Sequence, residues 1–168
     1  SLDTARFRYF ISEALEAGIE YVNAYILGEH GDSQVPIWSA ANIGGVPIDD
    51  YVAQTGKILD KETISQRTRD GGAEVIRLKG ATFYGIAMSV SNIVERIMKD
   101  EKAILPVAHV LGEEFGSWAG VAISMPCVVG WNGIEKTLRL PMTDEEKQAM
   151  ENSVKTLQDF QKSVNNLI

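Results

Sequence analysis

The sequence is poor in the residue types that build several common kinds of functional site. It has one cysteine and two histidines among 168 residues, so an internal disulfide cannot form and a metal site, which usually recruits several His or Cys ligands, is not expected. Basic residues are also scarce, with 16 Lys and Arg against 23 Asp and Glu and a net charge of −7. Nucleic acids and anionic membranes attract basic surfaces, so neither is an expected partner.

Long hydrophobic segments are missing too. No stretch reaches the roughly 20 apolar residues needed to span a bilayer, and no basic-then-apolar leader is present. The single thiol, Cys127, lies in the apolar run 121–129 and is expected to be buried and inert. These features predict a protein of the reducing cytoplasm. The chain also begins at Ser1 without an initiator methionine, so we expect it to be a fragment of a longer protein.

A phosphate-binding glycine motif is a further absence. None of the 15 glycines has another glycine two positions away, so the dinucleotide-binding pattern G-x-G-x-x-G does not occur. The overall composition, with 45% hydrophobic and 23% charged residues, is typical of a globular protein. A length of 168 residues fits one compact domain with its own core.

The first half of the chain is predicted to contain two helices around a strand. Residues 3–17 place apolar side chains on one helical stripe, and Gly18 is expected to end that helix. Residues 20–27 are rich in Tyr, Val and Ile, which predicts a strand. Residues 61–78 have helical composition, and the adjacent glycines inside them, which cost roughly 2 kcal/mol in a helix, favour a bend or a close helix approach.

The second half is predicted to form a core helix and an antiparallel sheet. Residues 82–99 have a wide apolar face, which indicates a helix buried on more than one side. Strands are expected over residues 103–110, 120–129 and 134–140, the last two joined by a hairpin with an Asn-Gly signal. A capping box between Thr143 and Glu146 then starts a long helix that is expected to run to the C-terminus. Helices and strands in blocks indicate an α+β domain.

The most informative chemical group stands in a glycine-flanked turn. His30 lies in the segment LGEHGDS at residues 27–33. A histidine with its ordinary pKa of about 6.5 can accept and return a proton at neutral pH. Because Glu29 and Asp32 stand beside it, the segment is also compatible with an ordinary surface turn.

Two charged residues near the start of the chain have chemistry that suits such a histidine. Asp3 and Arg6 are three apart on the first predicted helix, so both can project from one face. A carboxylate can fix the tautomer of an imidazole, and a guanidinium can bind a substrate carboxylate bidentately. Each of these residues also has a purely structural alternative, since Asp3 can be a helix cap and Arg6 a surface cation. Thr82, which precedes a predicted helix, can likewise be a helix cap.

Five segments occur in the order and spacing of one enzyme family. They are LDTARFR at 2–8, AYILGEHGDS at 24–33, LKGATFYGIA at 78–87, PCVVG at 126–130 and NGI at 132–134. Over essentially its whole length the chain resembles the bacterial L-lactate dehydrogenases of the lactate/malate dehydrogenase family. The resemblance implies that residues 1–168 form the substrate-binding C-terminal domain, an α+β fold in which an antiparallel sheet packs with long helices.

The resemblance also implies roles for individual residues. His30 would accept the proton of the lactate hydroxyl, Asp3 would orient His30, and Arg6 would bind the substrate carboxylate. Ile86 would pack against the nicotinamide ring of NAD, the implied cofactor. The substrate-binding residues implied together are Asp3, Thr4, Ala5, Arg6 and Thr82.

The rest of such an enzyme would lie outside this chain. The resemblance implies that an N-terminal Rossmann domain, absent here, binds most of the NAD, so the isolated chain is expected to be inactive. It further implies a homotetramer in glycolysis and fermentation. Relatives activated by fructose 1,6-bisphosphate have an arginine at the position of Arg8 and a histidine at that of Asn23. Asparagine lacks the charge to pair with phosphate, so this activation is expected to be weak or absent.

Other interpretations stay open. Malate and branched-chain L-2-hydroxy acid dehydrogenases share the GEHG-type turn, and a main specificity position lies outside this chain. The isolated chain could also act as a non-catalytic assembly module through its apolar helices. Metal-dependent hydrolysis by residues 29–32 has little support, because His109 is the only other histidine.

Overall fold

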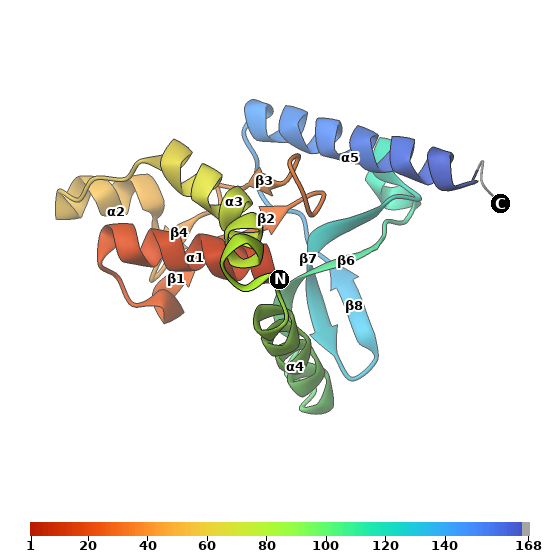
Figure 1. The fold of residues 1–168 in the computed structure, drawn as a ribbon, viewed down its shortest axis with the longest axis horizontal. Coiled ribbons are helices and arrows are strands. Elements are labelled where there is room, and N and C mark those ends of the chain that lie inside the picture. The colour runs from red at the N-terminus through yellow and green to blue at the C-terminus, as the bar shows by residue number, and fades with distance from the viewer. Residues whose placement is uncertain (166–168) are drawn as a thin grey trace.

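The computed structural model describes residues 1–165, in which helices surround antiparallel sheets (Figure 1). The helices are α1 (Leu2–Leu15), α2 (Ile48–Thr55), α3 (Lys61–Lys79), α4 (Tyr84–Met98) and α5 (Asp144–Asn165). The strands are β1 (Val22–Asn23), β2 (Ile26–Leu27), β3 (Val35–Pro36), β4 (Asn42–Ile43), β5 (Val46–Pro47), β6 (Ala103–Val110), β7 (Ala122–Gly130) and β8 (Gly133–Thr137). The α+β prediction is confirmed. No helix among residues 1–165 is long and apolar enough to cross a membrane.

The first helix follows the expected apolar stripe but ends early. Phe7, Ile11 and Leu15 are buried along α1. Glu16 then takes a left-handed conformation with φ of 51° and ends the helix. The expected stop at Gly18 is therefore wrong, because a non-glycine residue supplies the left-handed turn two positions sooner.

The single strand expected over residues 20–27 is also wrong. A short 3₁₀ helix occupies Ile19–Tyr21, and the extended part divides into β1 and β2. β1 pairs with β4 whereas β2 pairs with β3, so the two pieces belong to different sheets. The chain crosses from one sheet to the other at residues 24–25, which limits each piece to two residues.

The helix expected over residues 61–78 is confirmed as α3, and it runs without a break through its two glycines. Asp60 caps its start, because the Asp60 carboxylate accepts a hydrogen bond from the Thr63 N–H at 3.0 Å. This bond and one from the Thr63 hydroxyl lower the pKa of the Asp60 carboxyl. Gly80, with φ of 79°, ends the helix. The short helix α2, which precedes α3, was not predicted.

The sheet β6–β7–β8 confirms the strands expected in the second half. β6 occupies the predicted range and pairs with β7 along its whole length. β7 and β8 form the expected hairpin, with Trp131 and Asn132 in its loop. Gly133, the glycine of the predicted Asn-Gly turn, has a positive φ of 84°. β8 ends at Thr137, three residues before the predicted end.

Two apolar cores meet at β2. One core joins α1 to the sheet β1–β4–β5, α2 and α3 through Phe7, Ile11, Leu15, Val22, Ala24, Ile26, Ala41, Ile43, Ile48 and Ile64. The other joins β3, β7 and α5 through Leu27, Val35, Ile37, Leu111, Val121, Ile123, Met125, Cys127, Val129, Met150 and Val154. Consecutive residues of a strand point to opposite faces, so Ile26 enters the first core and Leu27 the second. β2 therefore lies between the two cores.

The core helix expected over residues 82–99 is not a core helix. It forms as α4, but none of its residues is buried, and Tyr84, Met88 and Met98 are 78%, 71% and 63% exposed. Figure 1 shows α4 projecting from one end of the fold, where it contacts β7 and α1. The apolar pattern correctly predicted the helix. It did not predict burial, because no described part of this chain covers the outer face of α4.

The long helix α5 begins at the expected capping box. The Thr143 hydroxyl accepts from the Glu146 N–H at 3.2 Å, and Glu146 Oε2 accepts from the Thr143 N–H at 3.0 Å. Glu146 Oε1 also accepts from the Ser39 N–H at 3.0 Å, so this residue ties the start of α5 to the segment after β3. The expected continuation to the C-terminus, residues 166–168, lies outside the described residues.

Alanine substitutions at the capping box should separate its two functions. We expect Thr143→Ala to lower the free energy of unfolding by about 1 kcal/mol, the usual effect of losing an N-cap side chain. Glu146→Ala should cost more, because it also removes the acceptors of Ser39. Urea unfolding measures both, with Lys155→Ala, an exposed position of α5, as the control. A smaller loss for Glu146→Ala than for Thr143→Ala would contradict the double role of Glu146.

Candidate active site

The turn that carries His30 is held at both ends. Gly28 follows β2 with φ of 85°, a left-handed conformation that favours glycine. Its backbone bridges to Ser124 of β7 through two N–H···O contacts of 3.4 Å. At the other end the Gln34 N–H donates to the Gly31 carbonyl at 3.2 Å. The turn between β2 and β3 is therefore fixed to the sheet and presents His30 at its tip.

One carboxylate links the charged residues of the site. Asp3 Oδ2 lies 2.5 Å from His30 Nδ1, and Asp3 Oδ1 accepts a hydrogen bond from Arg6 Nη1 at 2.9 Å. The side chains of Asp3 and Arg6 are 14% and 17% exposed, whereas that of His30 is 80% exposed. The pairing is therefore sheltered from water at Asp3, while the imidazole reaches outward. Within residues 1–165 the second ring nitrogen, Nε2, has no hydrogen-bond partner.

The imidazole faces a hollow between the turn and α4. His30 and Asp3 line this hollow of about 320 Å³ together with Ile86, Val90 and Ile93 of α4. Its volume lies at the lower end of the roughly 300–1,000 Å³ typical of small-molecule sites. The structure thus brings Ile86 to the same hollow as His30 and Asp3, although these residues come from three separate parts of the sequence.

Thr4 and Ala5 line a different hollow. With Arg8 they form part of a neighbouring hollow of about 570 Å³ that does not include His30. Thr4 is buried, and its hydroxyl accepts a hydrogen bond from the Ile26 N–H at 3.0 Å. The Thr4 side chain therefore fastens α1 to β2, the strand that leads to the histidine turn.

Arg6 and Thr82 do not line the hollow at His30. Arg6 reaches from α1 to α3, where a Cβ added to Gly71 would stand 3.0 Å from Arg6 Cδ. Of the bend or close helix approach expected at the glycine pair, the structure shows the close approach, and α3 continues through it without a break. Thr82 is half-buried in the loop between α3 and α4. Arg6 is joined to His30 only through Asp3.

The two residues considered for effector binding have other contacts. Arg8 Nε donates to the Ala24 carbonyl at 3.0 Å, and the Arg8 guanidinium lies 5.2 Å from the centroid of the Tyr25 ring. Asn23 Nδ2 donates to Asn42 Oδ1 at 3.2 Å. Arg8 therefore braces the crossing between β1 and β2, and Asn23 braces the pairing of β1 with β4.

Sequence reasoning missed the residue that holds the histidine turn from α5. Ser153 is fully buried, and its hydroxyl oxygen accepts a hydrogen bond from the Glu29 N–H at 2.7 Å. Glu29 directly precedes His30. The available signal was a serine on the apolar face of α5, between the core residues Met150 and Val154.

The other histidine and the cysteine belong to the sheet. His109 Nε2 lies 2.7 Å from Thr137 Oγ1, and His109 Nδ1 lies 3.6 Å from Cys127 Sγ. Cys127 is buried as expected, and burial raises the pKa of its thiol. In the described part of the chain, no group of three or more His, Cys, Asp or Glu side chains is placed to hold a metal ion.

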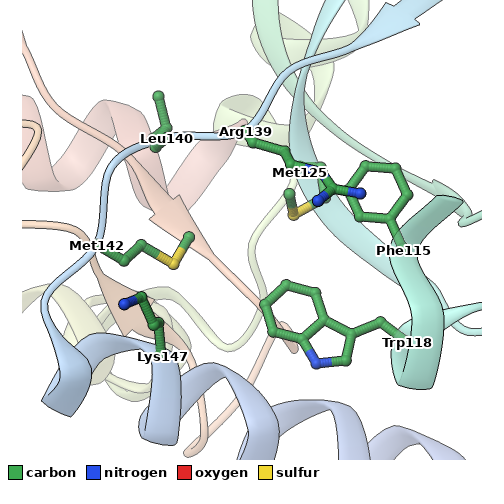
Figure 2. Close-up of a pocket in the computed structure, with 7 residues that line it drawn as sticks. All are labelled: Phe115, Trp118, Met125, Arg139, Leu140, Met142 and Lys147. Carbon is green, nitrogen blue, oxygen red and sulfur yellow. The ribbon is translucent and has the colours of Figure 1, made fainter.

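A separate apolar hollow of about 200 Å³ lies beside α5 (Figure 2). Its lining residues are Phe115, Trp118, Met125, Arg139, Leu140, Met142 and Lys147. The Arg139 guanidinium stacks over the Phe115 ring, 4.6 Å from its centroid. This hollow shares no lining residue with the one at His30 and holds no acid–base pair. The candidate active site is therefore the hollow at His30.

The arrangement at His30 suits proton transfer to or from a bound molecule that carries a negative charge. A carboxylate on Nδ1 holds the imidazole in one orientation, which leaves Nε2 to exchange a proton with a bound molecule. Arg6 adds a guanidinium on the other oxygen of the same carboxylate. Fold and site together define an α+β domain with a hydrogen-bonded His–Asp pair and an adjoining arginine.

Comparison with known proteins identifies the family. The model described as the lactate/malate dehydrogenase alpha/beta C-terminal domain matches residues 1–167, so the chain belongs to that family. An L-lactate dehydrogenase of Acetivibrio thermocellus is 42% identical over 166 residues, which are 97% of this chain and 52% of that protein. One of Lacticaseibacillus casei is 42% identical over 159 residues, or 94% of this chain and 48% of that protein. The chain thus spans about half the length of the curated relatives it matches.

Solved structures confirm the fold. MGS-M5, a lactate dehydrogenase from a Medee basin deep-sea metagenome library, superposes with a TM-score of 0.90 at 36% identity, over 94% of this chain and 51% of that one. The malate dehydrogenase of Cryptosporidium parvum also gives 0.90, at 32% identity over 98% of this chain and 53% of that one. Because both enzymes share the fold, the fold alone does not distinguish a lactate dehydrogenase from a malate dehydrogenase.

Two glycine substitutions test the packing of Arg6 against α3. Replacing glycine by alanine inside a helix gains about 1 kcal/mol from propensity alone. We expect this gain from Gly72→Ala, whose Cβ would stand 3.7 Å from the nearest Arg6 atom. Gly71→Ala should gain less or lose stability, because its Cβ would stand 3.0 Å from Arg6 Cδ. Urea unfolding of both variants measures the difference, and equal gains would show that Arg6 does not pack there.

Proposed function

We propose that this chain is the catalytic half of an NAD-dependent L-lactate dehydrogenase that interconverts L-lactate and pyruvate. The observation that carries the proposal is the contact of 2.5 Å between His30 Nδ1 and Asp3 Oδ2 beside a hollow of small-molecule size. The curated L-lactate dehydrogenases, at 42% identity, support lactate as the substrate.

In the proposed reaction His30 handles the proton. With Asp3 on Nδ1, the unprotonated Nε2 accepts the proton of the lactate hydroxyl as the C2 carbon becomes a carbonyl carbon. In the reverse direction the imidazolium returns that proton to the carbonyl oxygen of pyruvate. Asp3 stabilises the charged ring and keeps it oriented, and its low exposure of 14% strengthens this interaction.

Arg6 is the proposed partner of the substrate carboxylate. Only Arg6 Nη1 bonds to Asp3, and a guanidinium has five N–H donors in a planar fork. The remaining donors can bind a carboxylate bidentately, which fixes a 2-hydroxy acid in register with His30. Thr82, from the loop before α4, is the proposed further wall of the substrate pocket, and Thr4 and Ala5 belong to the proposed substrate segment 3–6.

The hollow suits a flat ring on the α4 side. Ile86 and Val90 line the same hollow as His30 and Asp3 and supply an aliphatic surface on which a nicotinamide ring can pack. NAD, when bound, would supply the hydride acceptor and donor, and most of its contacts would lie in a dinucleotide-binding domain outside this chain. The isolated chain is accordingly proposed to be inactive.

Further features of the proposed enzyme follow from the family. We propose a cytoplasmic homotetramer in glycolysis and fermentation, with a weak or absent response to fructose 1,6-bisphosphate. Arg8 is already engaged by the Ala24 carbonyl and Asn23 carries no charge, which supports the weak response. Malate and branched-chain 2-hydroxy acids are alternative substrates. An assembly module is the second candidate function, favoured by the exposed apolar face of α4.

The complete natural protein that contains this chain should lose most of its turnover on His30→Gln. We expect kcat to fall roughly 100- to 10,000-fold, because the variant cannot exchange the proton. NADH absorbance with pyruvate, oxaloacetate and branched 2-oxo acids measures the loss and identifies the preferred acid.

His109→Gln is the control for this prediction, because it makes the same chemical change in β6 and should leave kcat within about twofold. Unchanged turnover in His30→Gln would refute the role of His30, and a folded wild type inactive on every acid would favour the assembly module.

Arg6→Lys should damage substrate binding more than cofactor binding. Lysine keeps the charge but not the planar fork, so we expect KM for the 2-oxo acid to rise roughly 10- to 100-fold. KM for NADH should change by less than about threefold. Steady-state kinetics of the complete protein measure both constants, with Arg77→Lys on the exposed side of α3 as the control. Equal rises in the two KM values would indicate a folding defect instead.

A further inference from the structure

The buried hydroxyl of Ser153 joins the last helix to the turn that carries His30. We propose that Ser153 is a positioning residue of the active site, which fixes the His30 turn so that the imidazole meets Asp3. This inference rests on the proposed function for its consequence in catalysis, while its structural part stands on the contacts alone. Ser153 lies 124 residues from Glu29 in sequence, so folding of the whole chain brings the two together.

The first support is a buried hydrogen bond between the turn and α5. The Glu29 N–H donates to Ser153 Oγ at 2.7 Å, and Ser153 is 0% exposed. Removing a buried acceptor leaves the donor without a partner, which costs more than an average hydrogen bond contributes. In Ser153→Ala the Glu29 amide must find water or another acceptor, and either change moves the backbone next to His30.

The second support is the fit of Gly28 against Ser153. A Cβ added to Gly28 would stand 2.6 Å from Ser153 Oγ and 3.2 Å from Ser153 Cβ. Gly28 also has φ of 85°, where side chains are strained. A side chain at Gly28, two residues before His30, is therefore disfavoured both by the backbone conformation and by contact with Ser153.

The third support is the internal closure of the turn. The Ser33 N–H and hydroxyl both donate to the Glu29 carboxylate, the former at 3.2 Å. Ser33 Oγ also lies 3.3 Å from Ser153 Oγ, so the serine of α5 contacts both sides of the turn. The turn is thus a closed loop fastened to α5 at Ser153 and to β7 at Ser124.

The geometry of the site explains why this fastening matters. Asp3 stands on α1, which packs in one apolar core, whereas Ser153 stands on α5, which packs in the other. The contact between His30 and Asp3 therefore depends on holding the turn from the α5 side. Because catalytic geometry tolerates little displacement, a shift near 1 Å can cost about 100-fold in rate.

Ser153→Ala in the complete natural protein tests the inference. We expect kcat with the preferred 2-oxo acid to fall roughly 10- to 100-fold, with KM changed less than about threefold, because the substrate groups stay in place while the proton donor moves. Amide hydrogen exchange should speed up at Glu29 and its neighbours in the turn, and it should stay unchanged in α5. Thr156→Ala is the control, since it removes a hydroxyl that bonds only within the same helix.

A double-mutant cycle makes the inference independent of turnover. Gly28→Ala should cost less stability in the Ser153→Ala background than alone, because the contact of 2.6 Å with Oγ is gone while the φ strain is common to both. Additive losses, or unchanged Glu29 exchange in Ser153→Ala, would overturn the proposed positioning. An equal kcat loss in Thr156→Ala would also overturn it, by indicating a general effect on α5. If the wild type turns over no 2-oxo acid, the proposed function fails, and the exchange and cycle measurements still decide the role of Ser153.

Discussion

The carboxylate of Asp3 is the group on which the candidate site depends. Its two oxygens contact His30 Nδ1 at 2.5 Å and Arg6 Nη1 at 2.9 Å. Each contact joins a different part of the fold, because Arg6 packs against α3 and His30 stands on the turn held by β7 and α5. One short side chain on the first turn of α1 thus connects the two cores of the domain, and a shift of either core would separate His30 from Asp3.

Much of the fold could be predicted from local patterns. The helix over α3, the strand β6, the β7–β8 hairpin and the capping box of α5 were predicted, because their signals depend on neighbouring residues. The separation of β1 from β2 was missed, because two strands of different sheets are continuous in sequence. The burial of α4 was overestimated for a different reason. Its apolar face shows that the side chains avoid water, but a sequence does not say whether this chain covers them.

The candidate site was predictable to the extent that its residues resemble a family. Asp3 and Arg6 were chosen from one motif and His30 from another, and the structure brings both Arg6 and His30 into contact with Asp3. Ser153 was missed, because a serine among core positions of a helix has no local pattern that names its partner. Arg6 and Thr82 stand outside the hollow at His30, so this hollow does not gather all the residues that the sequence assigned to substrate binding.

The tautomer of the His30 ring tests the central role of Asp3 most directly. Nitrogen-15 NMR of the labelled complete protein, at a pH where the ring is neutral, distinguishes Nδ1–H from Nε2–H. A hydrogen bond from Nδ1 to the Asp3 carboxylate predicts the Nδ1–H form, which leaves Nε2 ready to accept a proton. In Asp3→Asn the preference for that form should disappear. A ring held as Nε2–H in the wild type, or a tautomer that Asp3→Asn does not change, would contradict the orienting role of Asp3.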